Sequence, residues 1–172
     1  DWTLDAETLA EATGADTVAL LNDLQAQGHA LGHLNAGALD VIIPGPPPNL
    51  AAAQLVVGLG TGFNAAPVYN TPGGRYVPPA EAGHASLPVR TEEQLALATF
   101  VTERHGFASI EDALSGRGLA AIHEFVCARA GTPDVAPSHE VMARLAGTNA
   151  AAARAREALA LFVRLAGEVC GD

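Results

Sequence analysis

Apolar positions along the chain change in spacing between its first and second parts. In the first part, short apolar runs lie between turn signals, and such runs predict buried or half-buried strands. One helix is expected from Thr3 to Gly14 and another from about Asp23 to His33. The predicted strands are Thr17–Leu21, Gln54–Gly58, Phe63–Tyr69 and Arg75–Val77, with a turn from Tyr69 to Gly74 between the last two.

In the second part of the chain, the spacing of apolar residues predicts helices. Thr91 followed by Gln94 has the spacing of a capping box, and apolar residues at Leu95, Ala98 and Val101 continue the helical pattern. The predicted helices are Thr91–His105, Ser109–Leu114, Gly116–Ala130, Ser138–Leu145 and Asn149–Glu168. No internal repeat is present. With 172 residues, this order of strands first and helices after predicts a single α/β domain over 1–172.

Charge and composition narrow the range of partners. The net charge is −10, with nine arginines and no lysine, so no basic patch exists for nucleic acid or an anionic membrane. No apolar run approaches the roughly 20 residues that span a bilayer. Cys127 and Cys170 have neither metal-ligand nor disulfide spacing, which predicts free thiols, a cytoplasmic location and no protein-bound metal.

One candidate catalytic residue stands where a predicted strand meets a helix. Asp23 follows Asn22 at the end of the run Thr17–Leu21, on a rigid element that faces a crevice in α/β sheets. An Asp there can accept a proton from an attacking hydroxyl. The alternative for this dipeptide is an ordinary helix N-cap.

Three further segments carry candidate chemistry, each with a structural alternative. Glycines in Gly58–Gly62 let backbone N–H groups approach an anion, and Thr61 adds a hydroxyl, although a tight turn with positive φ is the alternative. Glu81 and His84 suit a polyol, or are a loop acid and a packed histidine. Glu111 is a possible ligand, or a first-turn acid that favours its helix.

Only two cations lie near these segments. They are Arg75 and Arg117, and either is a candidate for contact with a phosphate. The alternative is that both are solvated surface residues.

Taken in order, these segments resemble motifs of the bacterial ATP-dependent glucokinases. Leu20–Ala26 is similar to "I-N-D-F-x-A", and Gly60–Gly62 is similar to the end of "G-x-G-T-G". The other matches are Pro79–His84 with "P-G-E-G-G-H", Ser109–Leu119 with "S-x-E-R-V-L-S-G-P-G-L" and Ala158–Phe162 with "R-A-L-x-L-F". The resemblance extends over essentially the whole chain.

The resemblance implies a ribonuclease H-like, actin-type sugar kinase, mostly its large domain. Such an enzyme moves the γ-phosphate of ATP, which carries Mg²⁺, to the 6-hydroxyl of glucose at the start of glycolysis. The implied roles are a catalytic base at Asp23, contacts to the other sugar hydroxyls at Asn22, Glu81, His84 and Glu111, and phosphate binding at Gly60, Thr61 and Gly62.

Departures from the family pattern shape the expectation further. The motif "D-x-G-G-T-N" and a glycine-rich adenosine segment do not occur, so we expect a segment truncated at both ends that binds better than it catalyses. Arg117 replaces a proline, Leu24 a phenylalanine, and Ala80 and Ala82 glycines. The zinc-binding cysteine cluster of a related family is missing, which indicates the zinc-free branch.

Two alternatives to a kinase stay open at this point. One is a non-catalytic sugar-binding module of the same ancestry. The other is an acidic, helical interaction domain without a small-molecule site. Independently of these alternatives, a truncated sheet with a missing partner layer would expose apolar surface, and a homodimer is a possible outcome.

Overall fold

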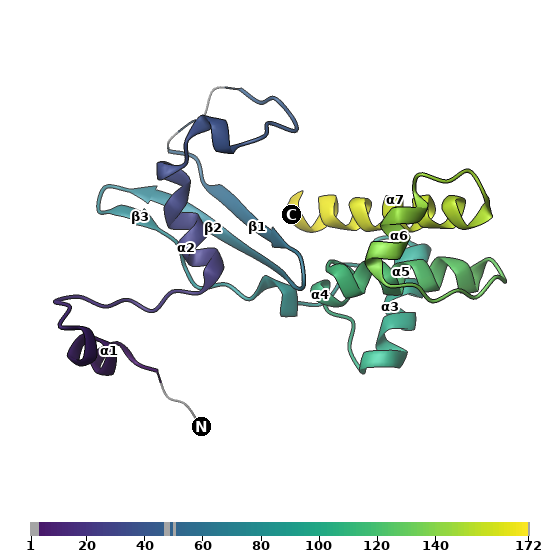
Figure 1. The fold of residues 1–172 in the computed structure, drawn as a ribbon, viewed down its shortest axis with the longest axis horizontal. Helices are drawn as coiled ribbons and strands as arrows, with labels where there is room; N and C mark the ends of the chain where they lie inside the picture. Colours follow the sequence, from purple (N-terminus) through teal and green to yellow (C-terminus); the bar gives the residue numbers. More distant parts are fainter. Residues whose placement is uncertain (1–3, 47–48, 50, 172) are drawn as a thin grey trace. The chain divides into compact units, whose positions relative to one another are not determined.

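The computed structural model describes residues 4–46, 49 and 51–171, and the chain divides into two compact units. The first unit comprises Asp1–Val56 and Ala66–Pro79, and the second comprises Val57–Ala65 and Ala80–Asp172. Figure 1 shows strands in the blue and teal part of the chain and helices throughout the green and yellow part. The prediction that all of these residues form one domain stays a prediction.

The first unit begins with two short helices. Asp5 caps the first of them by accepting the N–H of Thr8 at 2.7 Å, and Gly14 ends it with a φ of 68°. Thr3, the predicted start of this helix, lies outside the described residues. The helices are α1 (Ala6–Thr13) and α2 (Asp23–Ala30), followed by 3-10 turns at Leu31–His33 and Ala36–Ala38.

A sheet with the strand order β1-β2-β3 follows. Strands β2 and β3 are antiparallel, with Thr71 opposite Gly74. The prediction that a turn begins at Tyr69 is therefore wrong, because the strand continues to Thr71. Oγ1 of Thr71 donates to the carbonyl of Gly74 at 2.7 Å. Gly74 has a φ of 114°, a backbone conformation that favours glycine. The strands are β1 (Gln54–Leu59), β2 (Phe63–Thr71) and β3 (Gly74–Tyr76).

Helix α2 packs closely on the part of the sheet that belongs to the first unit. Leu24 is buried, and so are Val68 and Val77. A Cβ on Gly28 would lie 2.8 Å from a methyl carbon of Val77, so the helix approaches to a distance that only glycine allows. Nε2 of Gln25 donates to the carbonyl of Val77 at 3.1 Å. This hydrogen bond ties α2 to the segment that follows β3.

The predicted strand Thr17–Leu21 does not form. These residues enter α2 without strand structure, and Leu20 and Leu21 are 51% and 48% exposed. The sheet in the described part of the chain contains only β1, β2 and β3. A strand needs a hydrogen-bonded neighbour as well as apolar residues, and the apolar run specifies only the second.

The second unit is a helical bundle whose helices begin close to where the sequence predicts. Thr91 and Gln94 form the expected capping box, and Ser109 caps the short helix that follows. None of the helices in the described part of the chain is long and apolar enough to cross a bilayer. The bundle consists of α3 (Glu92–His105), α4 (Ile110–Ala113), α5 (Gly116–Arg129), α6 (Ser138–Arg144) and α7 (Ala150–Gly171).

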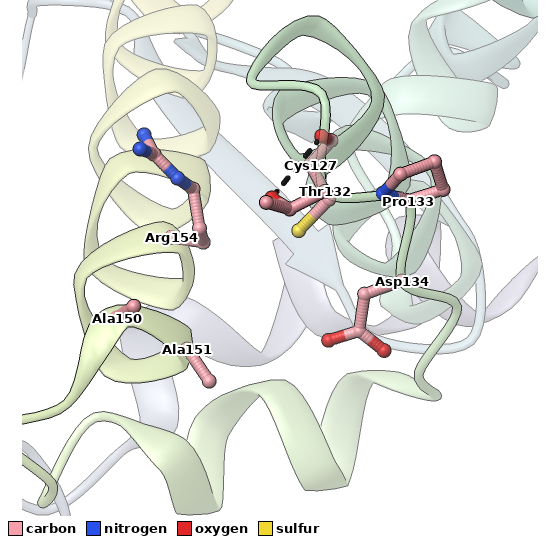
Figure 2. Close-up of a pocket in the computed structure, with 7 residues that line it drawn as sticks. All are labelled: Cys127, Thr132, Pro133, Asp134, Ala150, Ala151 and Arg154. Carbon is pink, nitrogen blue, oxygen red and sulfur yellow. Dashed lines mark hydrogen bonds between the residues drawn. The ribbon is translucent and has the colours of Figure 1, made fainter.

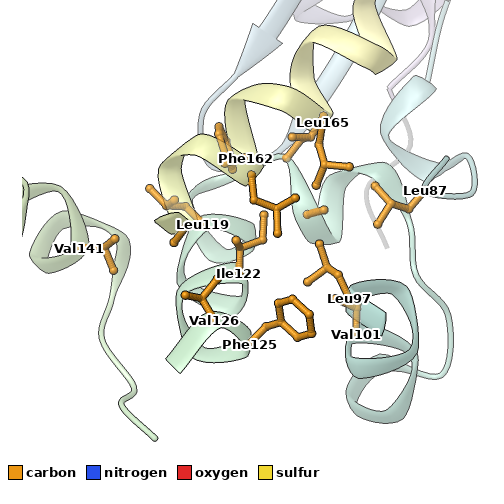
Figure 3. Packing of buried hydrophobic residues seen from close by; sticks show 14 of the residues in the cluster. Leu87, Leu97, Val101, Leu119, Ile122, Phe125, Val126, Val141, Phe162 and Leu165 are labelled. Carbon is orange, nitrogen blue, oxygen red and sulfur yellow. The ribbon is translucent and has the colours of Figure 1, made fainter. Parts of the chain in front are cut away.

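The core of this unit lies between α3, α5 and α7. Figure 3 shows Leu97, Ile122 and Leu165 pointing into the same space, and each of the three is 0% exposed. Outside the core, Arg129 of α5 bridges Glu93 of α3 at 2.6 Å and Glu157 of α7 at 2.8 Å. Because ion pairs this exposed contribute little, packing accounts for most of the stability of the bundle.

We expect Ile122→Ala to lower the free energy of unfolding by about 2–5 kcal/mol, because it leaves a cavity in a closed core. Val163→Ala on α7 is the matched control, since Val163 is 59% exposed and should change stability by less than about 0.5 kcal/mol. Urea unfolding followed by helical circular dichroism measures both. Equal losses in the two variants would contradict this description of the core.

Candidate functional site

The Gly60–Gly62 turn connects β1 to β2 within the second unit. It is closed by a hydrogen bond from the N–H of Gly60 to the carbonyl of Gly62 at 2.9 Å. Among the described residues, positive φ occurs only at Gly14, Gly74, Gly106 and Gly131, so the turn does not need glycine for that reason. At Gly60 a Cβ would meet open space, whereas at Gly62 it would collide with Oε2 of Glu111. A side chain at Gly62 would therefore push the carboxylate of Glu111 out of this position.

Glu111 lies in the first turn of α4 and is held between two donors. Its Oε2 accepts the backbone N–H of Phe63 at 3.1 Å, and its Oε1 accepts Nη2 of Arg117 at 2.5 Å. The side chain is 21% exposed. Phe63 directly follows the Gly60–Gly62 turn. Its hydrogen bond therefore places Glu111, a predicted sugar-binding residue, next to the turn that is predicted to bind phosphate.

The loop of Glu81 and His84 is fixed by Asn64 of β2. Oδ1 of Asn64 accepts the N–H of Ala82 at 3.0 Å, and its Nδ2 donates to the carbonyl of Ala80 at 2.6 Å. Glu81 and His84 are themselves exposed. The histidine is therefore not the packed core residue of the structural alternative, and both side chains face solvent where a ligand can reach them.

This loop also packs against α4, where Glu111 lies. A Cβ on Gly83 would collide with the carbonyl oxygen of Phe63 and would lie 3.3 Å from Cβ of Glu111. A short bridge between Ser86 and Ser109 continues the contact. The second unit thus brings together the Gly60–Gly62 turn, the loop of Glu81 and His84, and Glu111.

Asn64 is the residue of this site that the sequence reasoning missed. A signal for it was present, because asparagine is depleted in strands and Asn64 is the second residue of the predicted strand Phe63–Tyr69. An asparagine in a strand suggests a specific role for its side chain. Here the side chain of Asn64 forms hydrogen bonds with three backbone groups in the loop and the strand.

Asn22 and Asp23 belong to the first unit. Asn22 is the N-cap of α2, accepting the N–H of Gln25 at 2.7 Å, while Gln25 accepts the N–H of Asn22 in return. Asp23 is the first helical residue and is exposed; its Oδ1 accepts the N–H of Leu24 at 2.8 Å. The capping role thus falls to Asn22, and the use of Asp23 as a base stays a prediction.

The two cations named as phosphate candidates have partners within their own units. Arg75 donates to the carbonyls of Gly28 and His29 at 3.4 Å and 3.1 Å, at the end of α2 where the helix dipole favours a cation. Arg117 pairs with Glu111, as described above.

A second polar cluster lies away from these residues, at the end of α5. Sγ of Cys127 is 3.6 Å from Nε2 of His123, one helical turn earlier, and Nη1 of Arg144 is 3.4 Å from the same nitrogen. Nη1 of Arg144 also binds Asp134 at 2.5 Å. Arginine only donates, so Nε2 of His123 is the acceptor and the neutral ring carries its proton on Nδ1.

This cluster borders a pocket of about 330 Å³. Figure 2 shows the thiol of Cys127 and the carboxylate of Asp134 at its edge, opposite Arg154 on α7. None of the predicted sugar or phosphate residues lines it.

The donor atoms of His123, Cys127 and Asp134 lie within 4.8 Å of one another, a spacing that could hold a metal ion. The electrostatics oppose this. Burial and the charge of Arg144 lower the pKa of His123, and burial together with Asp134 raises the pKa of the Cys127 thiol. Arg144 already neutralises Asp134, so a metal would have to displace that cation and deprotonate a buried thiol.

We expect Gly83→Ala to lower the free energy of unfolding by roughly 1–3 kcal/mol, because its Cβ would force the loop away from Phe63. Gly60→Ala is the control: it lies in the same unit, and its Cβ would meet nothing within 4 Å. Thermal and urea unfolding of both variants provide the measurement. A Gly83→Ala protein as stable as Gly60→Ala would contradict the close approach of the loop.

The lowered pKa of His123 predicts a pH dependence of stability. The unfolded chain takes up a proton near pH 6.5, where the folded ring still resists protonation. His123 therefore contributes stability that is fully present above about pH 6.5 and is lost as the pH falls toward the folded pKa. Urea titrations between pH 8 and 5 should show this loss in the wild type and less of it in His123→Gln. His139→Gln, at an exposed position on α6, should keep the wild-type slope, and an identical slope in all three proteins would contradict the prediction.

Comparison with known proteins gives one consistent result. The glucokinase family model matches residues 1–172. The chain is 34% identical over 173 residues to a glucokinase of Chromobacterium violaceum, covering 99% of this chain and 49% of that protein. It is 29% identical over 174 residues to a glucokinase of Brucella abortus, covering 100% of this chain and 50% of that protein.

A solved structure agrees with these sequence relatives. The crystal structure of a glucokinase from an Antarctic psychrotroph superposes with a TM-score of 0.81 at 26% identity, covering 96% of this chain and 51% of that one. The α/β sugar-kinase fold expected from the sequence is therefore confirmed.

Proposed function

This chain belongs to the glucokinase family, and on that premise we propose that the protein containing it transfers the γ-phosphate of ATP to the 6-hydroxyl of glucose. The chain spans about half the length of the curated relatives it matches, so the activity is proposed for the whole protein. A solved structure of the same fold, a glucokinase of Balamuthia mandrillaris in complex with glucose, is 24% identical with a TM-score of 0.57 and covers 69% of this chain and 36% of that one.

The observation that carries the proposal is the position of Glu111. Its carboxylate touches the residue that follows the Gly60–Gly62 turn, and its helix packs against the loop of Glu81 and His84. A hexose needs several charge-assisted hydrogen bonds, and carboxylates are the strongest acceptors for its hydroxyls. A carboxylate beside a glycine turn would hold the sugar close to the phosphate that the 6-hydroxyl receives.

In this proposal Asp23 is the base, and Asn22 holds a neighbouring hydroxyl. Asp23 is the first residue of α2 and is exposed, so a hydroxyl of a bound ligand can reach its carboxylate. Since Asn22 supplies the helix cap, the carboxylate of Asp23 does not have to. Phosphoryl transfer relies mainly on positioning and charge stabilisation, and one base to orient the hydroxyl is sufficient.

The Gly60–Gly62 turn is proposed to lie against the transferring phosphate. The open space at Gly60 and the exposed Thr61 fit an anion approached by backbone N–H and hydroxyl donors. ATP would bring the Mg²⁺ that offsets its charge, which matters in a chain with a net charge of −10.

Two other expectations belong to this proposal. Cys127 and Cys170 are free thiols, which supports a reducing, cytoplasmic setting. Assembly as a homodimer stays a prediction.

The proposal is tested by Asp23→Ala in the protein of full natural length. Turnover of glucose with Mg-ATP should fall by at least about 10²- to 10⁴-fold, the usual contribution of a positioned base. Because Asp23 is exposed, stability should change by no more than about 1 kcal/mol. Glu7→Ala, an exposed first-turn acid on α1, is the matched control and should keep wild-type turnover.

Coupled detection of glucose 6-phosphate measures turnover, and calorimetry measures glucose binding. Full activity in Asp23→Ala would falsify the assignment of the base. Glucose binding by the wild type without any transfer would favour the non-catalytic sugar-binding module instead.

A further inference from the structure

We propose that Arg117 is a positioning residue for Glu111, which fixes the carboxylate in the orientation that accepts a sugar hydroxyl and thereby sets the affinity for the sugar. The inference rests on the proposed function. It concerns a contact that the family pattern cannot make, because that pattern has proline at this position.

The two donors on Glu111 constrain both of its oxygens. The N–H of Phe63 lies 3.1 Å from Oε2, and Nη2 of Arg117 lies 2.5 Å from Oε1. A carboxylate has about four acceptor positions, so each oxygen can still accept one more hydrogen bond from a ligand. Without Arg117, one oxygen would lose its fixed partner, and the carboxylate would be free to rotate about the bond to Phe63.

Arg117 is itself oriented by a second carboxylate. Its Nη2 lies 3.4 Å from Oδ1 of Asp112, and the other oxygen of Asp112 accepts Oγ of Ser109 at 2.6 Å and the N–H of Ser109 at 3.2 Å. Burial raises the pKa of Asp112, but the hydrogen bonds from Ser109 and the charge of Arg117 outweigh this and lower it overall. Asp112 is therefore a fixed negative charge that holds the guanidinium beside Glu111.

The backbone under Arg117 is tied to the phosphate turn. The N–H of Gly116 donates to the carbonyl of Gly60 at 2.8 Å, and Ser115 caps α5 by accepting the N–H of Gly118 at 3.1 Å. The arginine thus starts from a rigid helix end and reaches across to Glu111. The Arg117–Glu111 pair is therefore better fixed in position than an ordinary ion pair between two flexible side chains on the surface.

Exposure decides what kind of effect to expect. The side chain of Arg117 is 57% exposed, so its ion pair should contribute little to the stability of the fold. Sugar affinity responds differently. If the carboxylate of Glu111 is not held in one orientation in the free protein, the free energy of ordering it is subtracted from the free energy of binding. The effect should therefore appear in sugar affinity more than in melting temperature.

The test compares Arg117→Gln, Arg117→Pro and Arg117→Lys in the protein of full natural length. Gln and Pro should raise the KM for glucose roughly 2- to 10-fold, the effect of ordering one loosened side chain on binding, while kcat stays within about twofold. Lys keeps the charge without the planar fork and should restore part of the affinity. Melting temperatures should stay within about 4 °C, and proline is tolerated in the first turn of a helix.

Arg164→Gln is the matched control. Arg164 pairs with Glu93 at 3.2 Å, with exposures of 53% and 29%, so it removes a similar ion pair elsewhere in the same unit. It should leave both KM and kcat unchanged. In a Glu111→Gln background, Arg117→Gln should add no further rise in KM, because it acts only through that carboxylate.

Three results would overturn the inference while leaving the proposed function intact: an unchanged KM in Arg117→Gln and Arg117→Pro, a full additional rise in the Glu111→Gln background, or a fall in kcat at constant KM. The last would mean that Arg117 acts on the phosphate. A wild-type protein that neither phosphorylates glucose nor binds it by calorimetry would instead overturn the proposed function, and this inference with it.

Discussion

The backbone of Phe63 joins the bundle, the turn and the candidate site. Its side chain is 3% exposed and belongs to the core of the helical unit. Its N–H binds Glu111, and its carbonyl lies against Gly83 so closely that no side chain fits there. Because a buried peptide group must find partners for both of its polar atoms, packing the ring also fixes the carboxylate and the loop. The site therefore derives its geometry from the core.

Charges at the site are arranged in a way that suits a neutral, hydroxyl-rich ligand. Carboxylates dominate, and Arg117 is engaged with two of them rather than standing alone. A polyol requires acceptors of this kind, whereas an unpaired arginine would attract anions in general. The other buried polar cluster, around His123 and Cys127, contains a neutral ring and a protonated thiol, and it serves packing and a local ion pair.

Much of the helical part was predictable because its determinants are local. Caps at Thr91 and Ser109 and the helical period of apolar residues act within a few positions along the chain. The strand predicted at Thr17–Leu21 failed for the opposite reason, since strand pairing depends on a neighbour that is distant in sequence. The turn after β2 was placed too early because the pairing of Tyr69 with Tyr76 is likewise not a local property.

Motif order and helical period can be read along the chain, so the sequence alone indicated the family and most of the order of elements. The residues suited to sugar and phosphate were also chosen from the motifs, and their use stays a prediction. Three contacts of the candidate site depend instead on tertiary packing: Gly62 leaves room for Glu111, Asn64 holds the loop, and Arg117 holds Glu111. Each of these contacts joins residues that packing brings together from separate elements, and their spacing along the chain carries no trace of it.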